Sequence, residues 1–319
     1  MFKTDVEAAN AFLKKIDQLK AEIAKKVIGQ EEVIDQVLIS VFCKGHALLV
    51  GVPGLAKTLM INTIADCMGL KFNRIQFTPD LMPSDIIGAE VLDEKRAFKF
   101  IKGPVFSNII LADEINRTPP KTQAALLEAM QERTVTVAGK NHQLDNPFFV
   151  LATQNPIEQE GTYPLPEAQL DRFMFNIEVD YPSFEEEIKI IEQTTGISDP
   201  KLNIAINQEE IIFFQELIRR VPVNQSVVEY AVSLVQKSRP NAQNATDFIK
   251  KYVSWGAGPR ASQYLILGAK CHALKIGKYS PDIEDVKAVA KPILRHRLVK
   301  NYLAEADGLN VDSIIAEII

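Results

Sequence analysis

Short apolar runs alternate with helical patterns between about residues 46 and 178. Five of the runs are rich in β-branched or aromatic residues and are too short for a helix of normal length. We therefore predict five strands, at residues 46–50, 72–77, 108–113, 148–153 and 173–179. Uninterrupted apolar stretches such as IILA indicate burial on both faces, which is typical of a parallel sheet covered by helices.

The pattern changes after residue 182, where the chain becomes almost wholly helical. Ser183 and Glu186 have the spacing of a capping box, in which each side chain bonds the backbone N–H of the other, and they predict the start of a helix. The sequence therefore predicts an α/β core over residues 1–182 and a helical domain over residues 183–319. The total length of 319 residues also favours two domains over one.

Three further helix starts are predicted from local residue patterns. Ser226 and Glu229 repeat the capping-box spacing, and the run Ser-Pro-Asp at 280–282 favours another start. Thr118 followed by Pro119 favours a third, because proline at the first helical position loses no needed N–H. The last of these lies in the core and the other two lie in the helical domain.

Charged residues are nearly balanced along the chain. Lys and Arg total 36 and Asp and Glu total 41, which gives a formal net charge of -5 at pH 7, and no long run of one sign marks a tail. Since nonspecific binding to nucleic acid depends on positive charge, this balance argues against a general nucleic-acid binder. Hydrophobic residues make up 46%, which is enough for a sizeable core.

Cysteine usage and the first residues of the chain bear on its compartment. Cys43, Cys67 and Cys271 are far apart and form no CxxC pair, which argues against a disulfide-stapled secreted fold and fits the reducing cytosol. The first 26 residues are amphipathic and charged, unlike a secretory signal. No apolar run approaches the length that spans a bilayer. We therefore expect a soluble, cytoplasmic protein with no membrane partner.

The residues GVPGLAKT, at 51–58, follow the first predicted strand directly and lead into a helical pattern. Strand, glycine-containing loop and helix are the context of a phosphate-binding loop, in which the N–H groups of residues 54–58 converge on phosphate oxygens. Lys57 would then reach the β- and γ-phosphates, and Thr58 would hold magnesium. The candidate nucleotide contacts are Gly51, Pro53, Gly54, Leu55, Ala56, Lys57, Thr58 and Leu59.

One residue of this loop departs from the general pattern GxxxxGK[ST]. Ala56 occupies the position of the last glycine. By itself, the loop therefore leaves open an ordinary strand-to-helix turn with a solvated lysine.

Two adjacent carboxylates, Asp113 and Glu114, end the apolar strand predicted at 108–113. Ligands of open α/β sheets bind at this edge. Because side chains alternate along a strand, the two acids have different tasks. Asp113 can hold magnesium through its water shell, and Glu114 can polarise the water that attacks the γ-phosphate. Taken alone, a pair of acids that ends a strand by chance stays open.

Asn155 lies at the end of the next predicted strand, where its amide could orient the attacking water or contact the γ-phosphate. An asparagine before proline commonly only makes a turn, and that alternative stays open for Asn155 by itself. The order of the motifs is more specific than any one of them. A lysine loop, an acidic pair and a polar strand end, each at the carboxyl end of its own strand, together predict an ATP site with Mg²⁺.

With these motifs the chain resembles the MoxR-like AAA+ ATPases, specifically in the segments GVPGLAKT, LADEINR, FFVLATQNP and TYPLPEAQLDRF. The resemblance covers nearly the whole chain. It implies an AAA+ P-loop core whose five-stranded parallel sheet has the order 5-1-4-3-2, followed by an all-α lid domain. It also implies a homo-oligomeric ring, expected to be a hexamer, that binds ATP and Mg²⁺ between subunits.

The resemblance assigns a role to each candidate residue of the core. Lys57 and Thr58 match the Walker A lysine and threonine, and Asp113 and Glu114 match the Walker B acids. Asn155 matches sensor 1. In this assignment Lys57, Glu114 and Asn155 are catalytic, whereas Thr58 and Asp113 hold the metal.

Two arginines complete the implied site. Arg172, in LPEAQLDRF, matches the arginine finger of the neighbouring subunit's site, where a guanidinium stabilises charge on the transferred phosphoryl group. Arg260, in GAGPRAS, resembles sensor 2, because a helix start at Pro259 would let this arginine point from the lid at the γ-phosphate. For Arg172, the residues alone leave open an intrachain salt bridge with Asp171 or a neighbour.

Three further segments resemble parts of this family. Val27 and Ile28 resemble its adenine-contacting segment, in which they would form an apolar slot for the base, although a loop that simply packs on the core is the open alternative. Residues 88–106 resemble the hairpin that interrupts helix 2, and residues 134–143 resemble the hairpin before sensor 1. Such hairpins are expected to face the pore or one rim of the ring.

The resemblance implies a chaperone-like ATPase that remodels or matures a protein client, with a von Willebrand factor A domain protein as partner. Two other functions stay open, namely the motor subunit of a metal chelatase and a nucleic-acid-dependent motor whose relatives share these hairpins. The acidic balance and the lack of a basic, aromatic-interleaved strip argue against nucleic acid.

Overall fold

The computed structural model describes residues 2–92, 94, 96–158, 160–196 and 200–319. Five strands form one parallel sheet in the order β2-β5-β8-β1-β9. Numbered along the chain from one to five, this is the predicted order 5-1-4-3-2 viewed from the other edge. All five predicted strands are present, with ends shifted by at most two residues: β1 (Ala47–Val50), β2 (Phe72–Gln76), β5 (Ile109–Asp113), β8 (Phe149–Gln154) and β9 (Phe175–Glu178).

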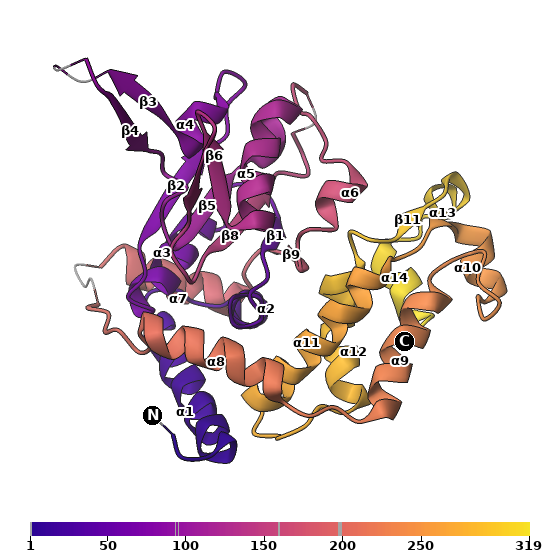
Figure 1. Cartoon of the computed structure of the whole chain (residues 1–319). Coiled ribbons are helices and arrows are strands. Elements are labelled where there is room, and N and C mark those ends of the chain that lie inside the picture. The colour runs from indigo at the N-terminus through magenta and orange to yellow at the C-terminus, as the bar shows by residue number, and fades with distance from the viewer. Residues whose placement is uncertain (1, 93, 95, 159, 197–199) are drawn as a thin grey trace.

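The central strands are buried on both faces, as their uninterrupted apolar runs predict. In β5, Ile109 and Leu111 pack into one apolar cluster and Ile110 and Ala112 into another, because side chains alternate across a strand. Helices cover both faces (Figure 1). The first cluster contains residues of α1 (Asp5–Ile23), α2 (Glu31–Phe42) and α3 (Lys57–Cys67), and the second contains residues of α4 (Pro83–Ile87) and α5 (Pro120–Glu132).

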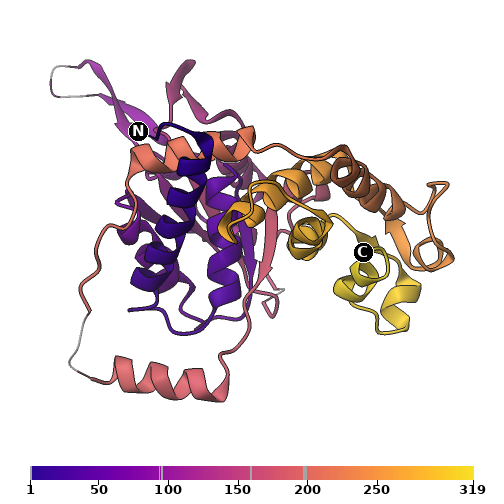
Figure 2. The same cartoon turned by 90° about the horizontal axis from the view of Figure 1, so that it is seen from below.

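The second half of the chain is helical apart from one small antiparallel sheet, which the all-α prediction lacked. That sheet pairs β10 (Val253–Trp255) with β11 (Val299–Lys300). Figures 1 and 2 show most of this half, in orange and yellow, beside the core. Its helices are α7 (Phe184–Thr194), α8 (Gln208–Arg220), α9 (Gln225–Lys237), α10 (Asp247–Tyr252), α11 (Pro259–Lys275), α12 (Ile283–Leu294), α13 (Tyr302–Ala306) and α14 (Val311–Ala316).

Helix α8 packs against the core helices α1 and α2 (Figure 1). The Gln215 side chain donates a hydrogen bond to the Val41 carbonyl at 2.7 Å, and the rings of Phe214 and Phe12 meet edge to face with centroids 5.2 Å apart. One continuous apolar cluster therefore joins α1, α8 and the helices beyond it. The domain boundary at residue 182 stays a prediction.

Two helix starts show how capping residues compete. The capping box of Ser183 and Glu186 is confirmed, since each side chain accepts a hydrogen bond from the other's backbone N–H. The start at Ser226 and Glu229 is wrong, because α9 begins at Gln225 and the Asn224 side chain accepts from the Ser226 N–H. Asparagine is at least as good a cap as serine, so it caps the helix two residues earlier.

The other two predicted starts are shifted by a few residues. Helix α12 begins after Asp282, which forms a capping box with Asp285, so the aspartate of the Ser-Pro-Asp run is the cap. In the core, α5 has Pro119 as its N-cap in an extended conformation and Pro120 as its first helical residue. A residue before proline is biased away from the helical region, so the second proline of the pair starts the helix.

Two antiparallel hairpins are present where residues 88–106 and 134–143 predict them. The first pairs β3 (Gly88–Leu92) with β4 (Phe98–Lys102), and Figure 1 shows it projecting from the core. The second pairs β6 (Thr134–Val137) with β7 (Lys140–Gln143). In the described part of the chain, no helix combines the length and the apolar character needed to cross a membrane.

Candidate functional site

Two residues of the loop between β1 and α3 have a left-handed backbone. Ala56, the N-cap of α3, is left-handed with φ 51°, and Gly54 is left-handed with φ 88°. The position of the last glycine in the general pattern is thus left-handed in this chain. Alanine adopts this conformation at a free-energy cost of about 1 to 2 kcal/mol. A Cβ atom added to Gly54 would meet no atom within 4 Å, so the loop borders open space there.

Lys57 points back into this loop. Its Nζ donates hydrogen bonds to the carbonyl oxygens of Gly51 and, at 3.2 Å, Val52. Burial lowers the pKa of the Lys57 ammonium, and the charges of Asp113 and Glu114 oppose part of that shift. Among the described residues Lys57 has no ion-pair partner, so this half-buried cation suits an anionic ligand.

The two acids that follow β5 are tied together by a threonine of the neighbouring strand β8. The Thr153 hydroxyl donates to Asp113 Oδ1 at 2.6 Å and accepts from the Glu114 N–H at 2.8 Å. Arg74 of β2 donates to Asp113 Oδ2 at 2.6 Å. Because Thr153 is only 1% exposed, it holds the backbone and the first carboxylate in one orientation.

Glu114 turns away from the strand and presents its carboxylate at the sheet edge. Its backbone is left-handed, with φ 57°, and it caps the short 3-10 helix η1 (Ile115–Arg117). The carboxylate oxygen Oε2 accepts from Gln76 Nε2 at 3.0 Å and from Arg117 Nη1 at 3.1 Å. Both acids therefore lie at the carboxyl edge where the lysine loop also lies.

Four of these contact residues were not predicted as part of the site: Arg74, Gln76, Arg117 and Thr153. For Thr153 the sequence did contain a signal, because this residue is polar and lies near the end of the apolar run FFVLATQ. Gln76 lies opposite Asp113 in the parallel register of β2 and β5. That pairing depends on the order of the strands, so no local pattern marks Arg74 or Gln76.

Asn155 directly follows β8 and is half-buried. Its side-chain oxygen accepts a hydrogen bond from the Ile157 N–H at 3.1 Å, which is a local turn. No described contact joins its side chain to Asp113 or Glu114. The role of Asn155 toward a nucleotide stays a prediction.

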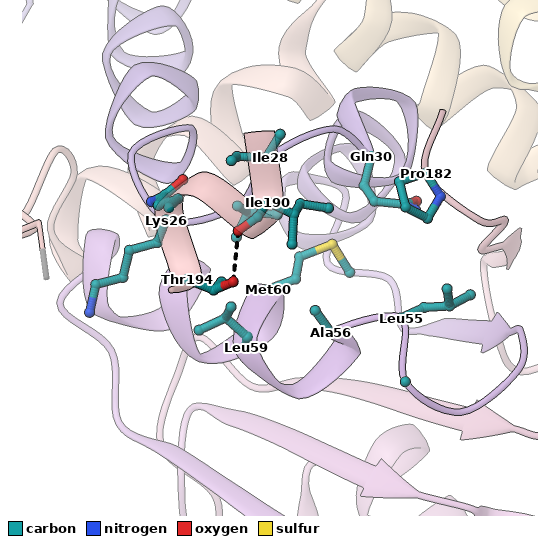
Figure 3. A pocket seen from close by; sticks show the side chains of 13 residues that line it. Lys26, Ile28, Gln30, Leu55, Ala56, Leu59, Met60, Pro182, Ile190 and Thr194 are labelled. Carbon is teal, nitrogen blue, oxygen red and sulfur yellow. Dashed lines mark hydrogen bonds between the residues drawn. The ribbon is translucent and has the colours of Figure 1, made fainter. Parts of the chain in front are cut away.

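An apolar pocket adjoins the loop between β1 and α3. Figure 3 shows Ile190 and Thr194 of α7 across the pocket from Leu59 and Met60 of α3, with Ile28 beside them. Val27, Gly54, Leu55 and Ala56 also line it. The structure thus brings the segment predicted to contact adenine next to the loop predicted to hold phosphate.

Arg172 and Arg260 lie at the opposite edge of the sheet. Both line a second cavity together with His46, which directly precedes β1, whereas Lys57 lies beyond the carboxyl end of that strand. Arg260, rather than Arg172, pairs with Asp171, at 2.9 Å. The structure therefore brings the two predicted arginines together but does not bring either of them to Lys57 of the same chain.

A buried arginine holds the segment that carries Arg172. The Arg297 guanidinium donates to Asp171 Oδ1 at 2.7 Å, to the Asp171 carbonyl at 2.9 Å and to the Phe173 carbonyl at 2.7 Å. Arg297 is 5% exposed. The helical half of the chain is thus attached directly to the residues on both sides of Arg172.

His46 joins three elements at this edge and makes stability depend on pH. The Val150 N–H donates to Nδ1 at 3.0 Å, so Nε2 carries the proton and donates to the Met130 carbonyl at 3.0 Å. Burial lowers the pKa of His46 from 6.5 to about 4. A base whose folded-state pKa is lowered stabilises the fold above its unfolded pKa, and this contribution is lost as the pH falls from 6.5 to 4.

We expect His46→Gln, which keeps a donor and an acceptor, to reduce this acid sensitivity. The wild-type free energy of unfolding should fall by about 3 kcal/mol more than that of the variant between pH 7 and pH 4. Urea unfolding at several pH values measures the difference. Burial also lowers the pKa of His296, so some slope should remain in the variant. Equal slopes in the two proteins would contradict the assignment.

The chain matches two known sequence families. Residues 46–175 match the ATPase family associated with various cellular activities (AAA). Residues 247–318 match the AAA lid domain. The first match contains the lysine loop, the acidic pair and Arg172, and the second contains Arg260.

Individual proteins resemble the chain over nearly its whole length. Chaperone MoxR1 of Mycobacterium tuberculosis is 44% identical over 93% of this chain and 79% of its own length. The uncharacterised protein YeaC of Bacillus subtilis is 42% identical over 93% of this chain and 90% of its own length. The crystal structure of a candidate ATPase from Cytophaga hutchinsonii has 44% identity and a TM-score of 0.92, and the match covers 98% of this chain and 95% of that one.

Proposed function

Because the chain belongs to the MoxR family of AAA+ ATPases, we propose that it binds Mg·ATP between two copies of itself and hydrolyses it to remodel or mature a protein client. One observation carries the proposal. A half-buried lysine in a phosphate loop lies at the same sheet edge as two carboxylates, and an apolar pocket adjoins the loop. The lysine loop and the two carboxylates suit a triphosphate, and the apolar pocket suits the adenine base of the nucleotide.

Thr58 and Asp113 fit a magnesium ion. Mg²⁺ prefers oxygen ligands and retains several of its waters, and these residues offer a hydroxyl and a carboxylate at adjoining strand and helix ends. The Thr58 hydroxyl makes no hydrogen bond within the described residues, so it is available as a ligand. When bound, the ion neutralises charge on the phosphate oxygens.

Glu114 would act as the general base. Gln76 and Arg117 orient one oxygen of its carboxylate, and the other oxygen can accept the proton of the attacking water. Lys57 would place its ammonium against the negative charge that develops on the phosphate oxygens. Asn155, directly after β8, would help to orient the water.

The two arginines at the far edge support assembly from several copies. Arg172 has no ion-pair partner among the described residues, and neither Arg172 nor Arg260 lies near Lys57 of its own chain. A second copy whose phosphate edge faces this arginine edge would complete the site. A ring closes such head-to-tail contacts, and the resemblance favours six copies.

An exposed apolar hairpin supports a protein client. Leu92 and Phe98 pair across β3 and β4 and are 62% and 72% exposed. Apolar side chains at a projecting tip suit contact with apolar segments of another protein. The relative from M. tuberculosis is named a chaperone, which agrees with this role. We propose a von Willebrand factor A domain protein as the accessory partner.

Lys57→Ala tests the core of the proposal. We expect at least tenfold weaker binding of Mg·ATP, since the ammonium is the loop's charged contact to the phosphates. Isothermal titration calorimetry measures the affinity, and Lys14→Ala, which removes an exposed lysine of α1, is the control. A wild-type protein without affinity for Mg·ATP in any oligomeric state would refute the proposed function.

A further inference from the structure

The cavity that contains Arg172 is strongly basic. Lys44, Arg133, Arg172 and Arg260 all line it. The neighbouring carboxylate, Asp171, is already bonded by Arg260 at 2.9 Å and by Arg297 at 2.7 Å. Among the described residues, no carboxylate lies within ion-pair distance of the other three lining cations. The cavity therefore presents excess positive charge, which Glu216 offsets only in part at Lys44.

Arg133 and Lys44 are the members of this group that the function proposed above leaves unexplained. The Arg133 guanidinium is half-buried and donates to the Lys44 carbonyl at 3.3 Å. Burial and the nearby charge of Arg219 lower the pKa of Arg133, and burial likewise lowers the pKa of Lys44. A cation that is partly removed from water without a counterion costs free energy, which an anionic ligand would recover.

The backbone at these positions is also strained. Arg133 ends α5 with φ 54°, and Lys44 has φ 57°. Left-handed residues other than glycine are uncommon and gather at functional sites. Ala56 and Glu114, at the nucleotide site, are two of the other left-handed residues among those described. Glycine is the usual residue where a helix ends in a left-handed conformation, so arginine at this position costs conformational free energy.

We propose that Arg133 and Lys44 form an anion pocket for the terminal phosphate of the nucleotide held by an adjacent copy of the chain. This inference rests on the proposed function, in which Arg172 faces that same phosphate. Arg260 is committed to Asp171, so Arg133 and Lys44 are the cations of the cavity that remain available beside Arg172. The His46 bond to the Met130 carbonyl anchors the end of α5 just before Arg133.

Arg133→Gly separates a structural role from a phosphate-binding role. Glycine relieves the left-handed backbone and removes the buried charge, so the thermal midpoint should not fall. The ATP turnover of the assembled protein should nevertheless fall at least about tenfold, the scale of one lost contact to a developing phosphate charge. Affinity for Mg·ATP at the variant's own loop should stay within about threefold. Arg133→Lys should recover part of the turnover, because it restores the charge.

Mixed assemblies test whether the pocket acts on an adjacent copy. Arg133→Gly and Lys57→Ala proteins carrying different tags are mixed, and assemblies that contain both are isolated with the two tags. In these assemblies, the intact nucleotide loop of an Arg133→Gly copy can face the intact pocket of a Lys57→Ala copy. Such interfaces should hydrolyse ATP, so turnover should exceed that of either variant alone. Arg220→Ala, which removes an exposed arginine paired with Asp5, is the control for the loss of one charge.

Three results would overturn the inference. One is turnover of Arg133→Gly within twofold of wild type, and another is a mixed assembly with no recovery. The third is loss of assembly with normal turnover in what remains assembled, which would assign the pocket to a carboxylate of the adjacent copy. If Lys57→Ala and Glu114→Gln also retained normal turnover, the proposed function itself would fail. If only Lys57→Ala and Glu114→Gln lost turnover, the proposed function would hold and the proposed anion pocket would be wrong.

Discussion

Glu114→Gln should lower the turnover of ATP about 10²- to 10⁴-fold, the range attributed to a general base. Affinity for Mg·ATP should stay within about threefold of wild type. The amide has nearly the shape of the carboxylate and can still accept hydrogen bonds from Gln76 and Arg117. It cannot take a proton from water, so positioning survives while activation of the water is lost.

Steady-state turnover and calorimetric titration measure the two quantities separately. Glu158→Gln is a matched control, because Glu158 also faces Arg117, at 3.7 Å, but is 51% exposed and lies in the loop after β8. The control should retain turnover within twofold. Normal turnover in Glu114→Gln would remove Glu114 from its role, and a joint loss in both variants would indicate that Arg117 is the critical group.

Arg172→Ala should reduce turnover about 10³-fold or more without weakening nucleotide binding at its own loop. The reason is geometric, because Arg172 lies at the amino edge of the sheet and Lys57 beyond the carboxyl edge. In the proposed assembly, a guanidinium lost from the far edge would affect the phosphate of another copy. Turnover of the assembled sample and affinity of unassembled copies test this separation, with Arg220→Ala as the control.

Mixing Arg172→Ala with Glu114→Gln tests the shared site. Each interface in which an intact Glu114 of one variant faces an intact Arg172 of the other should regain turnover. Hybrid assemblies with no recovered activity would contradict the interface assignment. Weaker binding of Mg·ATP by unassembled copies of Arg172→Ala would place Arg172 at the loop of its own chain instead.

The contacts of Asp171 connect this interface to the helical half of the chain. Arg260, in the first turn of α11, and Arg297, just beyond α12, both bond the Asp171 carboxylate. Arg297 also holds the carbonyl oxygens beside Arg172. A displacement of these helices would therefore move Arg172 as well. In the proposed assembly, this arrangement would offer a direct route by which the helical half affects hydrolysis in an adjacent copy.

The sequence by itself predicted the features that depend on neighbouring residues. Uninterrupted apolar runs marked the five strands, and glycines with a lysine before a helical pattern marked the loop between β1 and α3. The capping box at Ser183 and Glu186 was also found, because its bonds join residues three apart. Where several capping residues compete within a few positions, as at Asn224 and Ser226, the prediction was wrong.

Only the tertiary structure decided which distant residues meet. Thr153 reaches both Asp113 and Glu114 because β8 lies beside β5, and Gln76 reaches Glu114 because β2 lies on the other side. Local patterns identify a strand but not its neighbour. For the same reason, the residues alone left open a salt bridge between Arg172 and Asp171, whereas packing of the helical half pairs Asp171 with Arg260.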